Sequence, residues 1–262
     1  MKRRYWTIGH RLPASLKTPL FGDRCKFGQE IRQDDPDWSE WQQFSLEFYQ
    51  RTQKRGLGKM VNDAGYEILR HVDLTGRNVL EIGPGSLPHR RFWTGRPSRY
   101  EVVDVKREFL ECSMRMLKQD GLDAASFVLS GHALPLENDC VDVLISFYSL
   151  EHLHPLSDYL REFCRVMHPG GLLVGGIPCE GGLAWGGGRW LTTRRYIKKH
   201  TEIDPDKIIC WEHPNHAEHI LQALACCFEP VRLHFWPLWV PLVDFNLICS
   251  FIYRKGTEEN EG

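Results

Sequence analysis

The chain has 262 residues, which is long enough for one large domain with appendages and a buried core. Its 33 basic and 34 acidic side chains nearly cancel, so no overall field favours nucleic acid or an anionic membrane as a partner. Nine cysteines occur without a Cys-x-x-Cys pair, and no apolar stretch follows the charged N-terminus. No uninterrupted apolar run reaches the roughly 18 residues of a membrane span. We therefore expect a cytoplasmic protein with reduced thiols, without a signal peptide, a transmembrane segment or a nucleic-acid partner.

The first part of the chain predicts an arm followed by helices. Residues 1–35 are rich in proline, glycine and aspartate, a composition typical of irregular loops. A helix is expected from Trp38 to Arg55, with Asp37 as its N-cap, and a second helix from Lys59 to His71. The first helix carries large apolar side chains, namely Trp41, Phe44, Leu46, Phe48 and Tyr49. We assign residues 1–58 to an N-terminal arm and helical extension.

Further along, strand and helix patterns alternate. Strands are predicted at 78–83, 100–105, 126–130, 141–147, 171–177, 231–239 and 245–254, and helices at 86–94, 106–119 and 155–167. Alternation with nearly continuous apolar strands is typical of a mostly parallel sheet covered by helices on both faces. The sequence thus predicts an α/β domain with a seven-stranded sheet over residues 59–256. Residues 178–229 are expected to be an insertion after the fifth strand with one or two helices, and 257–262 an acidic tail.

The most informative motif is the Gly-Pro-Gly turn that follows the first predicted strand. Residues 79–86 read Val-Leu-Glu-Ile-Gly-Pro-Gly-Ser, and glycines at such a turn let a ligand approach the backbone. Asp104, at the end of the next apolar run, has the spacing of a carboxylate that binds a ribose. A dinucleotide fingerprint would need a third glycine where Pro88 stands, which argues against NAD. Glu81 can instead pair with an ammonium group, which S-adenosylmethionine carries.

Four motifs in order resemble the class I S-adenosylmethionine-dependent methyltransferases over roughly residues 59–178. They are the turn at 79–86, Asp104, the segment from Ser130 to Asp139, and the strand 141–146 with the Leu-Glu-His-Leu turn at 150–153. The resemblance implies a Rossmann-like fold, a methyl-transfer activity and S-adenosylmethionine as the cofactor. It places the cofactor contacts at Glu81, Gly83, Pro84, Gly85, Asp104, Val105, His132, Ala133 and Ser146.

His132 departs from the family pattern. The family usually has an aspartate at this position, which accepts a hydrogen bond from the adenine amino group. A neutral imidazole can also accept one such bond, although its charge depends on pH near neutrality. No metal is expected, because the three-residue steps between His213, His216 and His219 drift around a helix.

A methyl acceptor would lie at the carboxyl ends of the fourth and fifth strands. The polar side chains expected there are Tyr148, Glu151, His152, His154, Cys179 and Glu180. We predict His152 as the general base, with Glu151 and Tyr148 beside it in the catalytic site. Glu151 and His152 have an alternative reading, in which they cap the next helix or line the cofactor pocket.

Two segments beyond the motifs point to the acceptor. Residues 181–190 contain five glycines and two tryptophans, which predicts a mobile loop that closes over the ligand together with the 38–55 helix. A basic cluster follows, and it either binds an anionic part of the substrate or forms a solvated helix face. Its members are Arg189, Arg194, Arg195, Lys198 and Lys199.

These features predict a methyltransferase that acts on an oxygen or nitrogen of a small-molecule, glycan or lipid-linked acceptor. A homodimer is one assembly that the sequence allows. The alternative is a non-catalytic S-adenosylmethionine-binding scaffold with the same fold. A nicotinamide-dependent dehydrogenase is disfavoured by Pro88.

Overall fold

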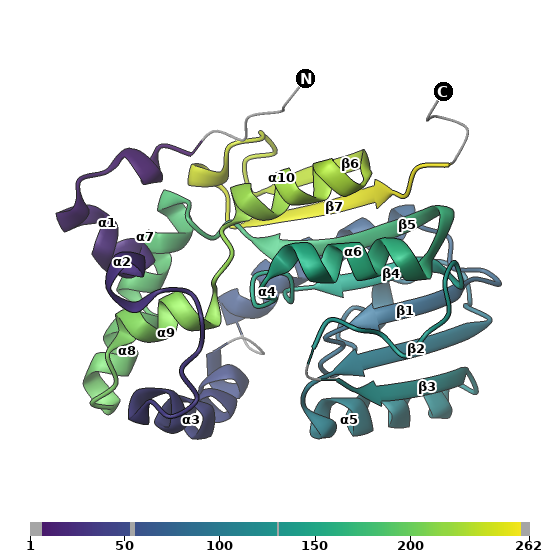
Figure 1. The fold of residues 1–262 in the computed structure, drawn as a ribbon, viewed down its shortest axis with the longest axis horizontal. Coiled ribbons are helices and arrows are strands. Elements are labelled where there is room, and N and C mark those ends of the chain that lie inside the picture. The colour runs from purple at the N-terminus through teal and green to yellow at the C-terminus, as the bar shows by residue number, and fades with distance from the viewer. Residues whose placement is uncertain (1–6, 53–55, 130, 258–262) are drawn as a thin grey trace.

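The computed structural model describes residues 7–52, 56–129 and 131–257 (Figure 1). Some of the predictions therefore lie outside the described residues. They concern the side chains of Leu46, Phe48 and Tyr49, the end of the helix expected to reach Arg55, Ser130, and the tail beyond residue 257. Among the described residues, no helix has the length and apolar character needed to cross a membrane.

A seven-stranded sheet forms the centre of the molecule, in the order β3-β2-β1-β4-β5-β7-β6. The first five strands pair in parallel, and β7 is antiparallel to both of its neighbours. The strands are β1 Asn78–Ile82, β2 Arg99–Asp104, β3 Asp123–Val128, β4 Val141–Phe147, β5 Met167–Pro178, β6 Glu229–Trp236 and β7 Ile248–Arg254. The predicted α/β, Rossmann-like sheet is confirmed, although β3 and β5 begin earlier than the pattern indicated.

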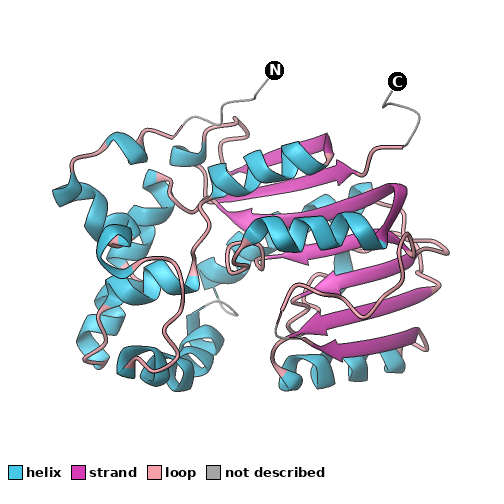
Figure 2. Ribbon diagram, viewed as in Figure 1, coloured by secondary structure: helices cyan, strands magenta, loops and turns pink. Residues whose placement is uncertain are grey.

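Helices cover both faces of this sheet (Figure 2). Successive strand residues point to opposite faces, so Leu144 of β4 packs into one core while Val143 and Ile145 pack into the other. The first core contains apolar residues of α6 and α10, and the second contains those of α5 and of the turn that follows α4. The helices are α4 Gly56–Tyr66, α5 Arg107–Gln119, α6 Leu156–Val166 and α10 Ala217–Cys227, with the 3-10 turn η2 Glu67–His71.

The helix predicted at 86–94 is wrong. The chain after β1 is irregular there, with a single 3-10 turn, η3 Arg90–Phe92. Pro88 supplies no N–H to a helix, and Leu87 has a φ of 50°, in the left-handed region that ends a right-handed helix. This segment instead folds back onto the end of β1.

The remaining helices form a second body, which we call the helical lobe. It consists of α1 Ala14–Phe21, α2 Arg24–Phe27, α3 Pro36–Thr52, α7 Leu183–Leu191, α8 Thr193–His200 and α9 Pro205–Glu212. A small apolar core that includes Trp38, Ile208 and Trp211 holds α3, α8 and α9 together. The parallel strands end on the side of the molecule where this lobe lies (Figure 1). Ligand sites of such sheets also lie at the carboxyl ends of the strands.

The lobe corrects two predictions about the N-terminal segment. Residues 1–35 are not an irregular arm throughout, because they contain α1 and α2. The N-cap of α3 is Asp35 rather than Asp37, since Asp35 Oδ1 accepts a hydrogen bond of 3.0 Å from the Asp37 N–H and Pro36 takes the first helical position.

The insertion at 178–229 also differs from its prediction. It contains four helices rather than one or two, and the last of them, α10, packs on α6 as part of the sheet cover. The glycine-rich residues 183–191 form α7 instead of a mobile loop.

Close packing explains one of the three glycines of α7. A Cβ on Gly186 would lie 2.8 Å from Phe21 Cε1 and 3.1 Å from Leu20 Cβ, so α1 and α7 touch at this residue. A Cβ on Gly188 would meet no atom within 4 Å, and Gly188 is exposed. Only Gly186 is therefore required for helix packing.

Asp244 fastens the lobe to the sheet. Its carboxylate is 1% exposed and accepts hydrogen bonds from the N–H groups of Ile8, Gly9 and Leu183. One side chain between β6 and β7 thus fixes both the start of the described chain and the first turn of α7.

The two glycines give a matched test of this packing. Gly186→Ala should lower the free energy of unfolding by about 1–3 kcal/mol, because the added methyl overpacks the α1–α7 contact. Gly188→Ala should raise it by up to about 1 kcal/mol, because alanine favours the helix and meets no neighbour. Urea denaturation of both variants checks this, and equal effects would contradict the contact.

Candidate active site

The Gly-Pro-Gly turn lies at the carboxyl end of β1 and has an open backbone. Gly83 and Gly85 have φ values of 70° and 55°, which explains why glycine stands at both positions. A Cβ on Gly85 would meet no atom within 4 Å, so space for a ligand lies against this turn. The carbonyl of Gly85 is held by Ser113 Oγ of α5 at 2.9 Å, while Pro84 is buried.

Glu81, which was predicted to contact the cofactor, is buried among polar side chains of the protein. Its side chain is 1% exposed, Oε1 lies 2.6 Å from His89 Nε2, and Oε2 accepts a hydrogen bond of 2.6 Å from Tyr100 OH. His89 Nδ1 accepts from Trp93 Nε1, so the ring proton stands on Nε2 and is donated to Glu81. The carboxylate thus fastens the segment after β1 through His89 and contacts β2 through Tyr100.

The other predicted cofactor residues also lie at the carboxyl edge of the sheet, and all but one of their side chains are at least partly exposed. Asp104 at the end of β2 is half-buried, and its burial raises the pKa of its carboxyl while the N–H of Lys106 opposes this. Val105 beside it is 63% exposed, and His132 and Ala133 are exposed in the loop after β3. Ser146 is the exception, because its side chain is completely buried within the sheet.

Two segments pack against each other next to this edge, namely residues 212–215 and the turn after β4, and we call this contact the clasp. Asn215 Nδ2 donates to the carbonyls of Leu150 and Leu153 at 2.9 and 2.6 Å, and the Asn215 N–H donates to the carbonyl of Glu151. The segment 212–215 after α9 is thereby fixed on the turn that follows β4. The turn after β4 also contacts the end of β1, because Ser149 Oγ donates to the carbonyl of Ile82 at 3.1 Å.

The predicted catalytic residues occupy this clasp. Glu151 is 2% exposed, and its Oε2 has no hydrogen-bond partner among the described residues. Burial raises the pKa of Glu151 to about 7, although His152 nearby lowers it. His152 is exposed, and its Nδ1 donates to the carbonyl of Glu212. Tyr148, with a φ of 53°, donates its hydroxyl to the carbonyl of Asn62 at 2.9 Å and so ties α4 to β4.

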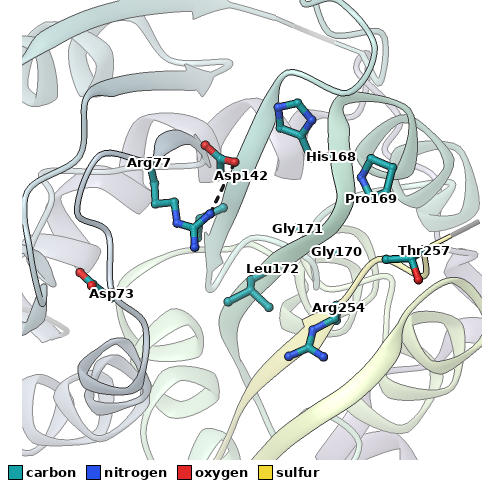
Figure 3. A pocket seen from close by; sticks show the side chains of 11 residues that line it. Asp73, Arg77, Asp142, His168, Pro169, Gly170, Gly171, Leu172, Arg254 and Thr257 are labelled. Carbon is teal, nitrogen blue, oxygen red and sulfur yellow. Dashed lines mark ion pairs between the residues drawn. The ribbon is translucent and has the colours of Figure 1, made fainter.

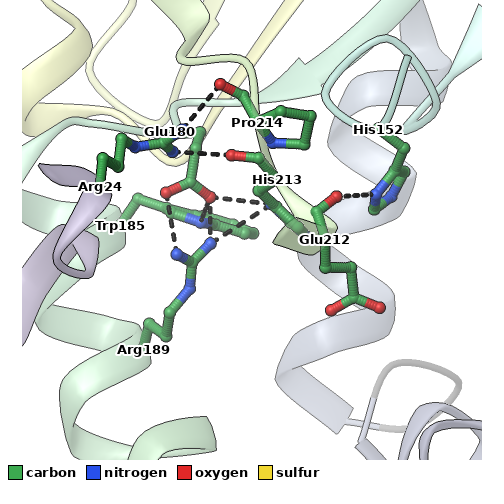
Figure 4. A network of polar contacts seen from close by, with 8 residues as sticks. All are labelled: Arg24, His152, Glu180, Trp185, Arg189, Glu212, His213 and Pro214. Atoms are coloured by element: carbon green, nitrogen blue, oxygen red, sulfur yellow. Dashed lines mark hydrogen bonds and ion pairs between the residues drawn. The ribbon is translucent and has the colours of Figure 1, made fainter. Parts of the chain in front are cut away.

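A buried charge network lies beside the clasp at the end of β5 (Figure 4). Glu180 is completely buried and binds Arg189 and Trp185 of α7, and its Oε2 lies 2.9 Å from His213 Nδ1. Although burial alone would raise the pKa of Glu180, Arg189 and His213 hold it well below its usual range. Arg24 of α2 completes the network by donating to the carbonyls of His213 and Pro214, both at 2.7 Å.

His213 and Arg24 were missed as site residues. His213, His216 and His219 were expected on neighbouring turns of one helix, but His213 and His216 lie between α9 and α10. Glu180 was predicted at the end of the fifth strand, and its partner His213 comes from a distant segment with no local motif. Within the described parts of the chain, no three His, Cys, Asp or Glu side chains are grouped to hold a metal ion.

The predicted basic cluster is not one site. Arg189 and Arg194 face inward and pair with Glu180 and Asp206, and the Arg195 guanidinium lies 4.8 Å above the Trp190 ring. Lys198 and Lys199 are exposed on α8. The cluster therefore divides between buried ion pairs and solvated side chains.

A cavity of about 440 Å³ lies at the opposite edge of the sheet (Figure 3). It is lined by residues near the amino end of β4 and the first part of β5, including Asp142 and His168. Asp142 accepts a hydrogen bond of 2.9 Å from the Asn78 N–H and pairs with Arg77, which fits its structural reading. This cavity shares no residue with the glycine turn or the clasp.

The sheet is similar to known proteins in both sequence and fold. Residues 80–175, from β1 to β5, match a family described as a methyltransferase domain. The fold is similar to the crystal structure of an S-adenosylmethionine-dependent methyltransferase from Aquifex aeolicus. The TM-score is 0.54 at 13% sequence identity, and the match covers 80% of this chain and 97% of that chain.

Residues 80–175 are thus similar to methyltransferase domains, and the fold of the chain is similar to that of a solved methyltransferase. Among curated proteins it is similar to phthiotriol/phenolphthiotriol dimycocerosates methyltransferase 1 of Mycobacterium ulcerans, with 32% identity over 109 residues. It is also similar to malonyl-(acyl-carrier protein) O-methyltransferase of Salmonella typhimurium, with 31% identity over 116 residues. The matches cover 40% and 42% of this chain, but only 38% and 43% of the two relatives.

The carboxyl edge of the sheet has a surface that fits S-adenosylmethionine, the cofactor named for the structure from Aquifex aeolicus. The fit rests on the open backbone at Gly85, the half-buried carboxylate of Asp104 and the exposed apolar Val105 next to it. These groups suit a backbone-bound ligand with a ribose and an aromatic base.

Glu151 should make the stability of the methyltransferase domain depend on pH. Its pKa is about 7 in the folded protein and near 4.5 when unfolded, so the folded state binds the extra proton between these values. Its contribution is fully present below pH 4.5 and is lost as pH rises through about 7. The full loss approaches about 3 kcal/mol, at 1.36 kcal/mol per pKa unit.

Glu151→Gln removes this titration. Urea denaturation at several pH values should show the variant gaining on the wild type by up to about 3 kcal/mol between pH 4.5 and 7. The matched control is Glu137→Gln, an exposed carboxyl that should show no such gain. A constant difference between the wild type and Glu151→Gln across this range would contradict the buried, protonated carboxyl.

Proposed function

We propose that this protein transfers a methyl group from S-adenosylmethionine to an oxygen or nitrogen of an acceptor molecule. The observation that carries the proposal is the contact between two groups of residues at the carboxyl edge of the sheet. The open glycine turn and Asp104 form a cofactor side, and Glu151, His152 and His213 form an acid–base side. Ser149 joins the two through its hydrogen bond to the carbonyl of Ile82.

The cofactor side uses most of the predicted residues. In the proposal, the backbone at Gly83, Pro84 and Gly85 receives the amino-acid end of the cofactor, and Asp104 accepts hydrogen bonds from the ribose. Val105, His132 and Ala133 contact the adenine. Glu81 and Ser146 are left out of direct contact because both side chains are buried.

Methyl transfer from a sulfonium is an in-line displacement, so it depends chiefly on holding donor and acceptor about 3 Å apart. Tyr148 fixes the end of β4 against α4, and Glu151 can donate a hydrogen bond in its protonated form. His152 stands at the exposed side of the clasp. A proton acceptor is needed when the acceptor atom is a hydroxyl oxygen or a protonated amine.

An oxygen acceptor is favoured by one of the two relatives, which is named as an O-methyltransferase. We propose that residues 59–256 form the catalytic unit and that the helical lobe covers the acceptor, a small molecule, a glycan or a lipid-linked compound. The lobe has the right place for this, because the parallel strands end on its side of the molecule (Figure 1). A homodimer and a cytoplasmic location stay predictions.

A second candidate is a cofactor-binding scaffold without transfer activity. His132 favours it, since an imidazole replaces the usual carboxylate at the adenine position. Transfer of a labelled methyl group separates the two. Purified protein with methyl-labelled S-adenosylmethionine is incubated with panels of phenols, amines, sugars and long-chain hydroxy compounds. Labelled product supports the methyltransferase, and tight binding without product from any panel supports the scaffold.

Asp104→Ala tests the cofactor side by itself. Loss of hydrogen bonds to a charged acceptor costs about 1.5–3 kcal/mol, so the Kd for S-adenosylmethionine should rise about 10- to 100-fold. Asp123→Ala makes the same charge change at the exposed amino end of β3 and should leave the Kd unchanged. Calorimetry measures both, and equal Kd values for the two variants would contradict the proposed ribose contact.

A further inference from the structure

We propose that His213, oriented by Glu180, is the general base that removes the acceptor proton. The proposal rests on the methyl-transfer function and names a residue outside the strand-four motif that the sequence indicated. It depends on the pairing of one ring nitrogen with a buried carboxylate, on the rigid hold of the backbone around it, and on its place in the clasp.

The pairing fixes the tautomer of the ring. A carboxylate can only accept hydrogen bonds, so the 2.9 Å contact with Glu180 Oε2 places the proton on Nδ1 of His213, since the other contact of Nδ1, with Arg189 Nη2, is longer at 3.4 Å. Arg189 keeps Glu180 ionised, because its guanidinium binds both carboxylate oxygens. Nε2 then carries a lone pair, which is the form of the ring that takes up a proton.

The backbone and ring of His213 are both held in place. Arg24 donates to its carbonyl, and Asn215 two residues later fastens the segment to the turn after β4. The side chain is 18% exposed, so it is neither sealed in the core nor free in solvent. Its ring centre lies 4.7 Å from that of His152, edge to face, which puts it beside the turn that reaches the end of β1.

The partner of Nδ1 distinguishes His213 from His152. Both rings donate through Nδ1, but His152 donates to the neutral carbonyl of Glu212 and His213 to an ionised carboxylate. An imidazolium formed at His213 is stabilised by that negative charge, whereas one formed at His152 has only a backbone dipole. This is the arrangement in which a carboxylate orients a catalytic histidine and stabilises its protonated form.

The charged groups around the ring set its proton affinity. Burial lowers the pKa of His213, Glu180 raises it, and His152 and Arg189 lower it further. The ring is therefore neutral at pH 7 and ready to accept a proton. Arg24 faces the carbonyl of His213 rather than its ring.

The proposed step transfers one methyl group and one proton. A lone pair of the acceptor oxygen or nitrogen forms the new bond to the methyl carbon, and the carbon–sulfur bond breaks with its electrons staying on sulfur. The acceptor proton passes to Nε2 of His213, which becomes an imidazolium paired with Glu180. Glu180 is a positioning residue, because it acts only through the ring.

Nitrogen-15 NMR of the imidazole side chains tests the tautomer without any acceptor. In the full-length protein at pH 7.5, the resonance missing from His213→Asn should show a protonated Nδ1 and an unprotonated Nε2. Glu180→Gln should shift the titration of this ring to lower pH, because the stabilising negative charge is removed. An Nε2-protonated ring, or no shift in Glu180→Gln, would overturn the proposal.

Kinetics with a hydroxyl acceptor from the panel test the catalytic role. His213→Ala should lower kcat at least 100-fold while changing the Kd for S-adenosylmethionine less than threefold. Added imidazole should restore part of the rate, which separates lost chemistry from lost folding. His219→Ala, an exposed histidine on α10, is the matched control and should retain wild-type kcat. A His213→Ala variant with kcat within threefold of wild type would overturn the proposal.

The two proposals fail in different ways. If no panel yields labelled product, the methyl-transfer function fails, whatever the state of the ring. If product forms with an unchanged kcat in His213→Ala, the methyl-transfer function stands and the base assignment fails.

Discussion

The structure of this site depends on one buried carboxylate, that of Glu180. An ionised group at this depth is costly to bury unless it is paired and hydrogen-bonded. Its partners are supplied by α7 and by the segment after α9, through Arg189, Trp185 and His213. The end of β5 therefore determines where the helical lobe must sit. Loss of Arg189 would leave the charge of Glu180 uncompensated inside the protein, whereas loss of Trp185 or His213 would remove a hydrogen bond from it.

Glu81, near the end of β1, is a second buried glutamate with a different structural role. Glu81 also has its oxygens occupied by buried partners, here His89 and Tyr100. These contacts replace the helix that the pattern predicted after the glycine turn, and they keep the turn's backbone accessible at Gly85. One buried glutamate thus holds the segment after β1, and the other joins the end of β5 to the helical lobe.

The sheet was predictable because its signals are local. Apolar runs of strand length and the turn at 83–85 specify a parallel α/β domain without knowledge of distant contacts. The glycines of 181–190 were misread because glycine serves both flexibility and close packing. Only the contact of Gly186 with α1, far upstream, decides between them. His213 was missed for a similar reason. Its structural role depends on its contact with Glu180, which lies far from it in the sequence, and not on the spacing of neighbouring histidines.

A crystal structure of the protein with S-adenosylhomocysteine bound would show directly whether the glycine turn and the segment around His213 form one site. We expect the sulfur at the carboxyl ends of β1 and β4, the ribose on Asp104, and Nε2 of His213 facing the space next to the sulfur. Binding of the product elsewhere, such as the cavity beside Asp142 and His168, would contradict this expectation. So would a His213 ring turned away from the sulfur while still paired with Glu180.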